Sequence, residues 1–226
     1  MPAKNPDLHG MVPDHSDVVL LLIDVINDLE FDSGAELFEH ALPMARKIAA
    51  LKARAREDGI PVIYVNDNFG RWRSDLNALV EHCLEDGVRG QPIVELLKPD
   101  EEDYFVLKPK HSGFFSTTLD TLLAYLKAKT LVLTGLTGNF CVFLTASDAF
   151  MRDYNIVVPK DCVASIKARD NDYALEQMRV VLDADLTVSD ELSFDRLRER
   201  TRGLTEGSAP KPDPQPEQFG HLRQSA

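Results

Sequence analysis

The chain alternates short apolar runs with longer segments of helical periodicity. Six of the runs are rich in Val, Ile and Leu and largely uninterrupted, which is the pattern of strands buried on both faces. They are Val18–Ile23, Val62–Val65, Tyr104–Leu107, Leu131–Leu133, Ile156–Val158 and Leu186–Val188. We predict a strand at each of them.

Helical patterns lie between these runs, where apolar residues recur every three or four positions. The sets are Phe38, Leu42, Ala45 and Ala49; Leu119, Leu122, Leu123 and Leu126; Val142, Ala146, Ala149 and Phe150; and Leu175, Met178 and Leu182. Residues 74–86 are a further candidate helix. Strand alternating with helix predicts an α/β fold, with a doubly wound six-stranded parallel sheet and helices on both faces.

The ends of the chain differ from this pattern, so we expect three parts. Residues 1–17 have prolines and no periodicity, and are predicted to form an N-terminal arm. Residues 18–202 form the single domain. In residues 203–226, prolines at 210, 212, 214 and 216 resist both helix and sheet. This tail is predicted to be extended or disordered, or alternatively to be a ligand for a proline-reading domain.

Composition narrows the choice of partners. The 226 residues hold 25 Lys and Arg against 37 Asp and Glu, a net charge of −12. This balance argues against nucleic acid or an anionic membrane as a partner. No apolar run is long enough to span a bilayer or resembles a signal-peptide core. Three cysteines are too few for a disulfide framework, so we expect a cytoplasmic protein.

Two charged residues end predicted strands. In doubly wound sheets, ligands bind at the carboxyl ends of the strands. Asp24 follows the first strand directly, where a carboxylate either faces a cleft or caps the following turn. Lys108 ends the third strand and precedes Pro109. Its ammonium could stabilise a thiolate or a developing oxyanion, or simply be solvated.

A cysteine follows the fourth strand. Asn139 is a candidate N-cap, which would place Cys141 in the first turn of a helix. Free amides there favour a thiolate and can bind an oxyanion, although an isolated cysteine can also be a core residue. Cys83 fits helix packing, and no helix start is aimed at Cys162.

Together these residues resemble the isochorismatase-like cysteine hydrolases. The resemblance is carried by Asp24 after a strand, by Lys-Pro-x-x-Ser-x-Phe from Lys108, and by Thr-Gly-Leu-Thr-Gly-Asn-Phe before Cys141. It runs from about Val18 to Ser189. It implies a Rossmann-like three-layer sandwich and a homo-oligomer.

The resemblance also implies roles for these residues. Asp24 would be the general base for the Cys141 thiol, and Lys108 the charge that steadies the thiolate. A cis peptide between Leu136 and Thr137 would place the Thr137 N–H beside that of Cys141 as an oxyanion hole. If the strand order is 3-2-1-4-5-6, Lys108 must reach inward across two strand spacings, about 10 Å.

The chain departs from the family pattern in two places. Many members carry Asp-x-Gln-x-x-Phe after the first strand, where this chain has Ile26 and Leu29. The nicotinamidase branch has a metal site that begins Asp-x-His after the second strand, but residues 66–72 contain no histidine, and no ligand spacing exists among the six histidines. We therefore expect no catalytic metal, no cofactor and no nicotinamidase activity.

We expect the substrate pocket to be lined by Leu29, Asn66, Asp67, Trp72, Phe114 and Phe140. Trp72 would stack on a planar substrate or cover the core. His111 could instead pair with Cys141 as a papain-like dyad.

The prediction is a metal-independent cysteine hydrolase that cleaves a C–N bond of a small amide or ureide through a Cys141 thioester. One alternative is a catalytically silent family member that acts as a binding or scaffold protein. Others are a vinyl-ether hydrolase of the isochorismatase type, disfavoured because that branch usually lacks the cysteine, and a redox role for Cys141 with Cys162.

Overall fold

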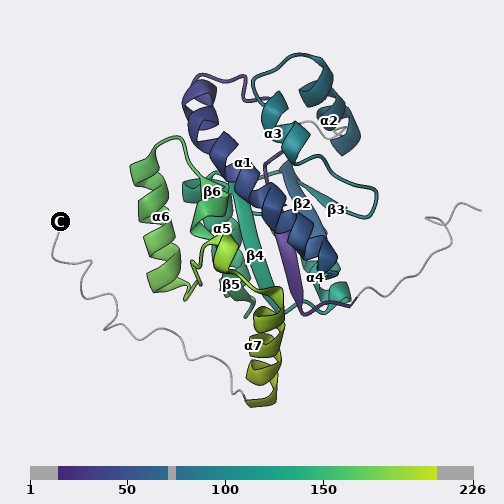
Figure 1. The fold of residues 1–226 in the computed structure, drawn as a ribbon, viewed down its shortest axis with the longest axis vertical. Coiled ribbons are helices and arrows are strands. Elements are labelled where there is room, and N and C mark those ends of the chain that lie inside the picture. The colour runs from purple at the N-terminus through teal and green to yellow at the C-terminus, as the bar shows by residue number, and fades with distance from the viewer. Residues whose placement is uncertain (1–14, 71–74, 208–226) are drawn as a thin grey trace, which may run out of the picture.

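A computed structural model describes residues 15–70 and 75–207 (Figure 1). Its strands are β1 (Val18–Ile23), β2 (Val62–Asp67), β3 (Tyr104–Lys108), β4 (Thr130–Leu136), β5 (Asn155–Val157) and β6 (Val163–Ala164). They form one parallel sheet in the order β3-β2-β1-β4-β5, and β6 also pairs with β4. The predicted α/β fold with a six-stranded parallel sheet is confirmed.

Helices cover both faces of the sheet (Figure 1). They are α1 (Gly34–Glu57), α2 (Leu76–Glu85), α3 (Gln91–Leu96), α4 (Leu119–Leu126), α5 (Phe143–Phe150), α6 (Ala168–Val181) and α7 (Phe194–Gly207). Side chains of β1 alternate between the faces, as a strand requires. Val18, Leu20 and Leu22 pack in one core with α1, α2 and α3, whereas Val19, Leu21 and Ile23 pack with α4, α5 and α6.

The sixth strand is not where we predicted it. Leu186–Val188 is not a strand, and an isolated bridge between Val157 and Asp185 is the pairing found there. The Asp185 carboxylate accepts hydrogen bonds from the Thr187 N–H (3.0 Å) and hydroxyl (2.6 Å), which turns the chain away from the sheet. Val163–Ala164 pairs instead with the end of β4, opposite Gly135 and Leu136.

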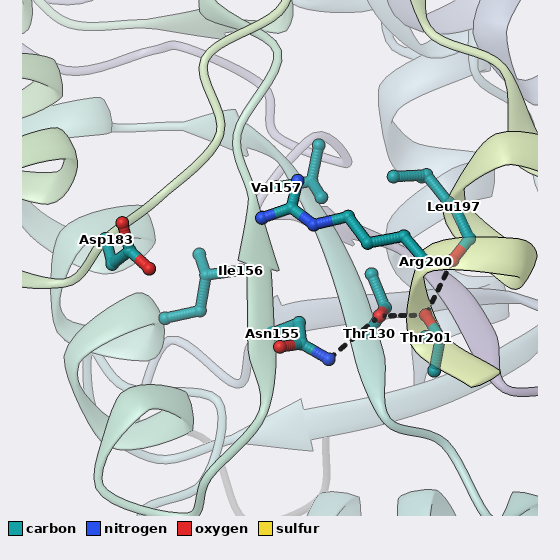
Figure 2. A pocket seen from close by; sticks show the side chains of 8 residues that line it. All are labelled: Thr130, Asn155, Ile156, Val157, Asp183, Leu197, Arg200 and Thr201. Atoms are coloured by element: carbon teal, nitrogen blue, oxygen red, sulfur yellow. Dashed lines mark hydrogen bonds between the residues drawn. The ribbon is translucent and has the colours of Figure 1, made fainter. Parts of the chain in front are cut away.

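The helix α7 was also not predicted, and it closes the amino ends of β4 and β5 (Figure 2). The Thr130 and Thr201 hydroxyls lie 2.7 Å apart, and Thr201 donates to the Leu197 carbonyl at 2.7 Å. The cavity between them is about 10 Å³, room for about one water and no organic ligand. Because α7 runs to Gly207, helix extends into the segment expected as a tail.

The remaining end segments fall largely outside the structure. Residues 1–14 of the expected arm and 208–226 of the expected tail are outside the described residues. Ser16 is attached to the domain, because its N–H donates to the Leu126 carbonyl at 3.0 Å. Among the described helices, none combines the length and apolarity needed to cross a membrane.

Candidate active site

Asp24 follows the carboxyl end of β1, and its side chain is 11% exposed. Its own N–H donates to the Val65 carbonyl at 3.0 Å, which ties the turn to β2. One carboxylate oxygen accepts the Asp67 N–H at 2.8 Å, and the other lies 2.9 Å from the Lys108 ammonium. The carboxylate is therefore held from two sides and cannot rotate freely.

Lys108 ends β3, and its side chain is fully buried. In the register of the sheet, Asp67 of β2 lies opposite Lys108, and β1 is the next strand. The lysine therefore reaches across β2, as the predicted strand order required. Its Nζ lies 2.9 Å from Asp24, 3.5 Å from Asp67 and 3.7 Å from the Cys141 Sγ.

Cys141 lies in a π-helical turn, Gly138–Val142, between β4 and α5. The peptide bond between Leu136 and Thr137 is cis, as the family resemblance implied. Asn139 is not the N-cap; Thr137 holds that position, and its carbonyl accepts the N–H groups of Phe140 and Val142, each at 3.1 Å. The Asn139 N–H instead donates to the Ser165 hydroxyl at 3.1 Å.

The loop that follows Lys108 is attached directly to the helix that follows Cys141. Thr145 donates to the Cys141 carbonyl at 2.7 Å, and its oxygen accepts the Gly113 N–H at 3.0 Å. One hydroxyl thus fixes the lysine loop relative to the sulfur. The four-residue spacing from Cys141 to Thr145, one helical turn, is a signal from which the first of these contacts could have been predicted.

Burial sets the protonation of the site. It raises the pKa of the Asp24 carboxyl above 3.8, against the lowering effect of Lys108. Burial and the neighbouring Asp24 charge raise the pKa of the Cys141 thiol to about 12, although Lys108 opposes them. Burial alone would lower the pKa of Lys108, but Asp24 and Cys141 raise it above 10.5. The resting sulfur is therefore a thiol that needs a base to react, and burial outweighs the effect of Lys108, which we expected to favour the thiolate.

Asp67 is the charged neighbour whose part the sequence did not reveal. Its N–H holds Asp24 and its carboxylate faces Lys108, so two carboxylates share one buried ammonium. This depends on the register between β2 and β3, which no local pattern encodes. Asn66, also expected in the pocket, is buried and bonds both the N–H (3.2 Å) and the carbonyl (2.9 Å) of Ile26.

The structure does not place the other expected pocket residues together. Leu29 is buried in the core with α1, and Phe114 in the core on the other face, where it packs against Tyr154 and Arg152. Phe140 is exposed beside the sulfur, and Trp72 lies outside the described residues.

The cysteines and histidines were the basis of two further expectations. Cys83 and Cys162 are fully buried free thiols in the core with α1, whereas Cys141 packs at the core on the opposite face. A Cys141–Cys162 disulfide therefore has no support in this arrangement. In the part of the chain that the structure describes, no three His, Cys, Asp or Glu side chains are grouped to hold a metal.

A family model and a curated relative both match this chain and indicate the same family. The model of the isochorismatase domain matches residues 18–188. The chain is 41% identical over 177 residues to YaaI of Bacillus subtilis (strain 168), an uncharacterized isochorismatase family protein, over 78% of this chain and 97% of YaaI.

Two further matches are to proteins with a named activity. The ureidoacrylate amidohydrolase RutB of Pantoea ananatis is 30% identical over 189 residues, which is 70% of this chain and 73% of RutB. The crystal structure of N-carbamoylsarcosine amidase from Thermoplasma acidophilum superposes with a TM-score of 0.61 and 30% identity, over 79% of this chain and 99% of the amidase.

Proposed function

The chain belongs to the isochorismatase family of hydrolases, and we propose that it cleaves a C–N bond of a small amide or ureide through a thioester on Cys141. The observation that carries the proposal is the position of the Lys108 ammonium. It lies 2.9 Å from Asp24 and 3.7 Å from the Cys141 sulfur, so one buried charge joins a base to a nucleophile. The two named relatives are an amidohydrolase and an amidase, which supports the choice of bond.

In the proposed acylation step, Asp24 takes the proton of the Cys141 thiol, whose pKa is raised by burial and by the neighbouring Asp24 charge. The sulfur then attacks the carbonyl carbon. A thiol with a raised pKa is a poor nucleophile until its proton leaves, so the adjacent carboxylate is essential. The N–H groups of Thr137 and Cys141, both in the turn after β4, would bind the oxyanion.

The remaining steps return the site to its starting state. Asp24 passes its proton to the leaving nitrogen as the C–N bond breaks, which leaves the thioester. Water then attacks the thioester carbon while Asp24 accepts a proton. The acid product departs and the proton returns to the sulfur, so protons and charges balance over the cycle.

The proposal is tested by a screen for ammonia release. Amides, carbamoyl compounds and hydroxamates are offered to the wild-type protein, with the Cys141→Ala protein as the blank. We expect release from at least one class by the wild type alone. Equal release by both proteins, or release from none of the compounds, would contradict the proposal.

Further parts of the proposal concern the surroundings of the reaction. We propose that residues 18–202 are the hydrolase domain, that no metal is required, and that the enzyme is a homo-oligomer. Three free thiols suit a reducing compartment, and we propose the cytoplasm. Stoichiometric zinc, iron or manganese in protein purified without added metal would overturn the proposal that no metal is required. Analytical ultracentrifugation would measure the oligomeric state.

A further inference from the structure

His111 lies next to the reactive sulfur but has no part in the proposed steps. It belongs to the loop after β3, and its Nδ1 lies 3.9 Å from the Cys141 Sγ. Phe140 meets the imidazole edge to face, with the ring centres 4.3 Å apart and the planes at 78°. His111 and Phe140 are exposed, whereas Lys108 is buried. The imidazole and the ammonium therefore approach the sulfur from its outer and inner sides.

The geometry does not make His111 a second base. A catalytic histidine is normally oriented by a carboxylate on its other nitrogen. Within the described part of the chain, the imidazole has an aromatic partner and a sulfur but no carboxylate. The carboxylate of Asp24, which shares the Lys108 ammonium with the sulfur, is already the proposed base for the thiol. His111 is therefore available to contact the substrate.

The position of the imidazole indicates which part of the substrate it meets. The carbon attacked by sulfur carries an oxygen, a leaving nitrogen and a retained group. The oxygen faces the backbone N–H groups, and the leaving nitrogen must face Asp24 to receive its proton. The retained group is left on the outer side. With 3.9 Å between Nδ1 and the sulfur, an atom bonded to that carbon on its outer side can come within hydrogen-bonding distance of the imidazole.

We propose that His111 is a specificity-determining residue that hydrogen-bonds a nitrogen on the retained side of the substrate. The site then prefers carbamoyl compounds, whose carbonyl carbon bears two nitrogens, over simple carboxamides. An imidazole with its proton on Nε2 presents Nδ1 as an acceptor for an N–H group, and a carbon substituent offers no donor. This inference rests on the proposed function and names its substrate class.

Two thiol reagents test the contact without a known substrate. Isocyanic acid, present in cyanate solutions, adds the thiol across its C=N bond and leaves an S-carbamoyl group with a nitrogen on the sulfur-bound carbon. Methyl methanethiosulfonate transfers a methylthio group, releases methanesulfinate and places no nitrogen there. The two rates at Cys141 are measured by mass spectrometry, and their ratio reports the contact independently of general thiol reactivity.

In His111→Phe, we expect the ratio of the cyanate rate to the thiosulfonate rate to fall about tenfold, the effect of one lost hydrogen bond. His111→Gln, which keeps an acceptor, should recover part of the loss. His40→Phe, an exposed histidine on α1, should leave the ratio unchanged. A ratio that is unchanged in His111→Phe, as it is when both rates fall equally, would overturn the proposal.

Turnover separates this inference from the proposed function. The values of kcat/KM are compared for a carbamoyl compound and the carboxamide in which a CH₂ replaces its retained nitrogen, and His111→Phe should lower their ratio about tenfold. If no compound is hydrolysed but the reagent ratio depends on His111, the hydrolase proposal fails and the contact stands. If hydrolysis occurs and neither ratio depends on His111, the assignment of His111 fails alone.

Discussion

The two ends of the sheet bury polar side chains in opposite ways. At the carboxyl end, which we call the reactive end, Asp24, Lys108 and Cys141 place two charges around a thiol. At the amino end, which we call the docking end, the Thr130 and Thr201 hydroxyls are buried and joined under α7 (Figure 2), whereas the charged Arg200 and Asp185 nearby stay partly exposed. A neutral hydroxyl pair satisfies its donors at small cost, whereas buried charges are expensive unless they are paired.

The two ends also shift the pKa values of their carboxylates in opposite directions. Burial raises the pKa of Asp24 above 3.8 despite its ammonium partner. Burial alone would also raise the pKa of Asp185, near α7, but hydrogen bonds from Thr187 and the charge of Arg200 hold it below 3.8. The docking end thus gains stability from its carboxylate, while the reactive end keeps one in a less favourable state that can accept a proton.

The largest expected effect is the loss of turnover in Cys141→Ala, by at least about a thousandfold. The melting temperature should change little, because the half-buried sulfur contributes reactivity and little packing. Cys162→Ala is the matched control, since it should retain turnover yet lose about 1 kcal/mol of stability from the core. Unfolding of Cys141→Ala at room temperature would show that the reactive end also supports the fold.

Lys108→Met should affect both activity and stability. Removal of the ammonium leaves Asp24 and Asp67 without their shared partner, so we expect at least about a hundredfold loss of kcat/KM and about 3 kcal/mol lower free energy of unfolding. Urea unfolding and kinetics measure the two losses. Lys110→Met, at an exposed neighbour, should change neither. If Lys108→Met had wild-type stability, the buried charges of the reactive end would not depend on their pairing, which would contradict the contrast drawn with the docking end.

The ionisation of Asp24 should raise activity and lower stability. As the proposed base, Asp24 can accept a proton only when ionised, so kcat/KM should rise as pH increases through its raised pKa, with the acid limb above 3.8. Its folded pKa exceeds its unfolded value, so its contribution to stability is complete below 3.8 and is lost as pH rises through the folded pKa.

Asp185 has the opposite sign, because its folded pKa lies below 3.8. Its contribution to stability is present above 3.8 and is lost as pH falls through the folded pKa. Urea unfolding between pH 2 and 7, compared for Asp24→Asn, Asp185→Asn and the wild type, resolves the two contributions. An acid limb of activity below 3.8 would be inconsistent with a buried Asp24.

The smallest expected effect is at the docking end. Thr201→Val removes one member of the hydroxyl pair, and we expect about 1 kcal/mol lower stability with unchanged turnover. The double variant Thr130→Val with Thr201→Val should cost less than the sum of the single changes, because each single change already removes the hydrogen bond between the two hydroxyls. Thr121→Val, at an exposed position on α4, is the control.

The sequence predicted the parts of the fold that depend on local patterns. The first five strands coincide with apolar runs of the sequence, which is why their positions could be predicted. Of these, β1, β2 and β4 are buried on both faces, whereas the edge strand β3 leaves Phe105 exposed, contrary to the expectation for that run. The two-residue strand Val163–Ala164 is too short to have a pattern, and α3, of six residues, is scarcely longer. The helix α7 is mostly polar, and Phe194 and Leu197 are its buried apolar contacts among the residues whose side chains are described.

The candidate site, like the fold, could be predicted from the sequence only where it depends on local patterns. Ligands of a doubly wound sheet bind near the carboxyl ends of its strands, and there the sequence places Asp24, Lys108 and Cys141. The contact of Asp67 with Lys108 depends on strand register, and that of His111 with Cys141 on the path of a loop. The raised pKa of the thiol results from burial, which a motif does not specify.

The position of β3 in the sheet has a consequence for control of the enzyme. Among the described strands, β3 is bonded on one side only, to β2, and it carries Lys108, on which the proposed mechanism depends. Such a margin strand can detach while the centre of the sheet stays folded. The catalyst would then lose its cation by local fraying, and would be silenced without denaturation of the whole molecule.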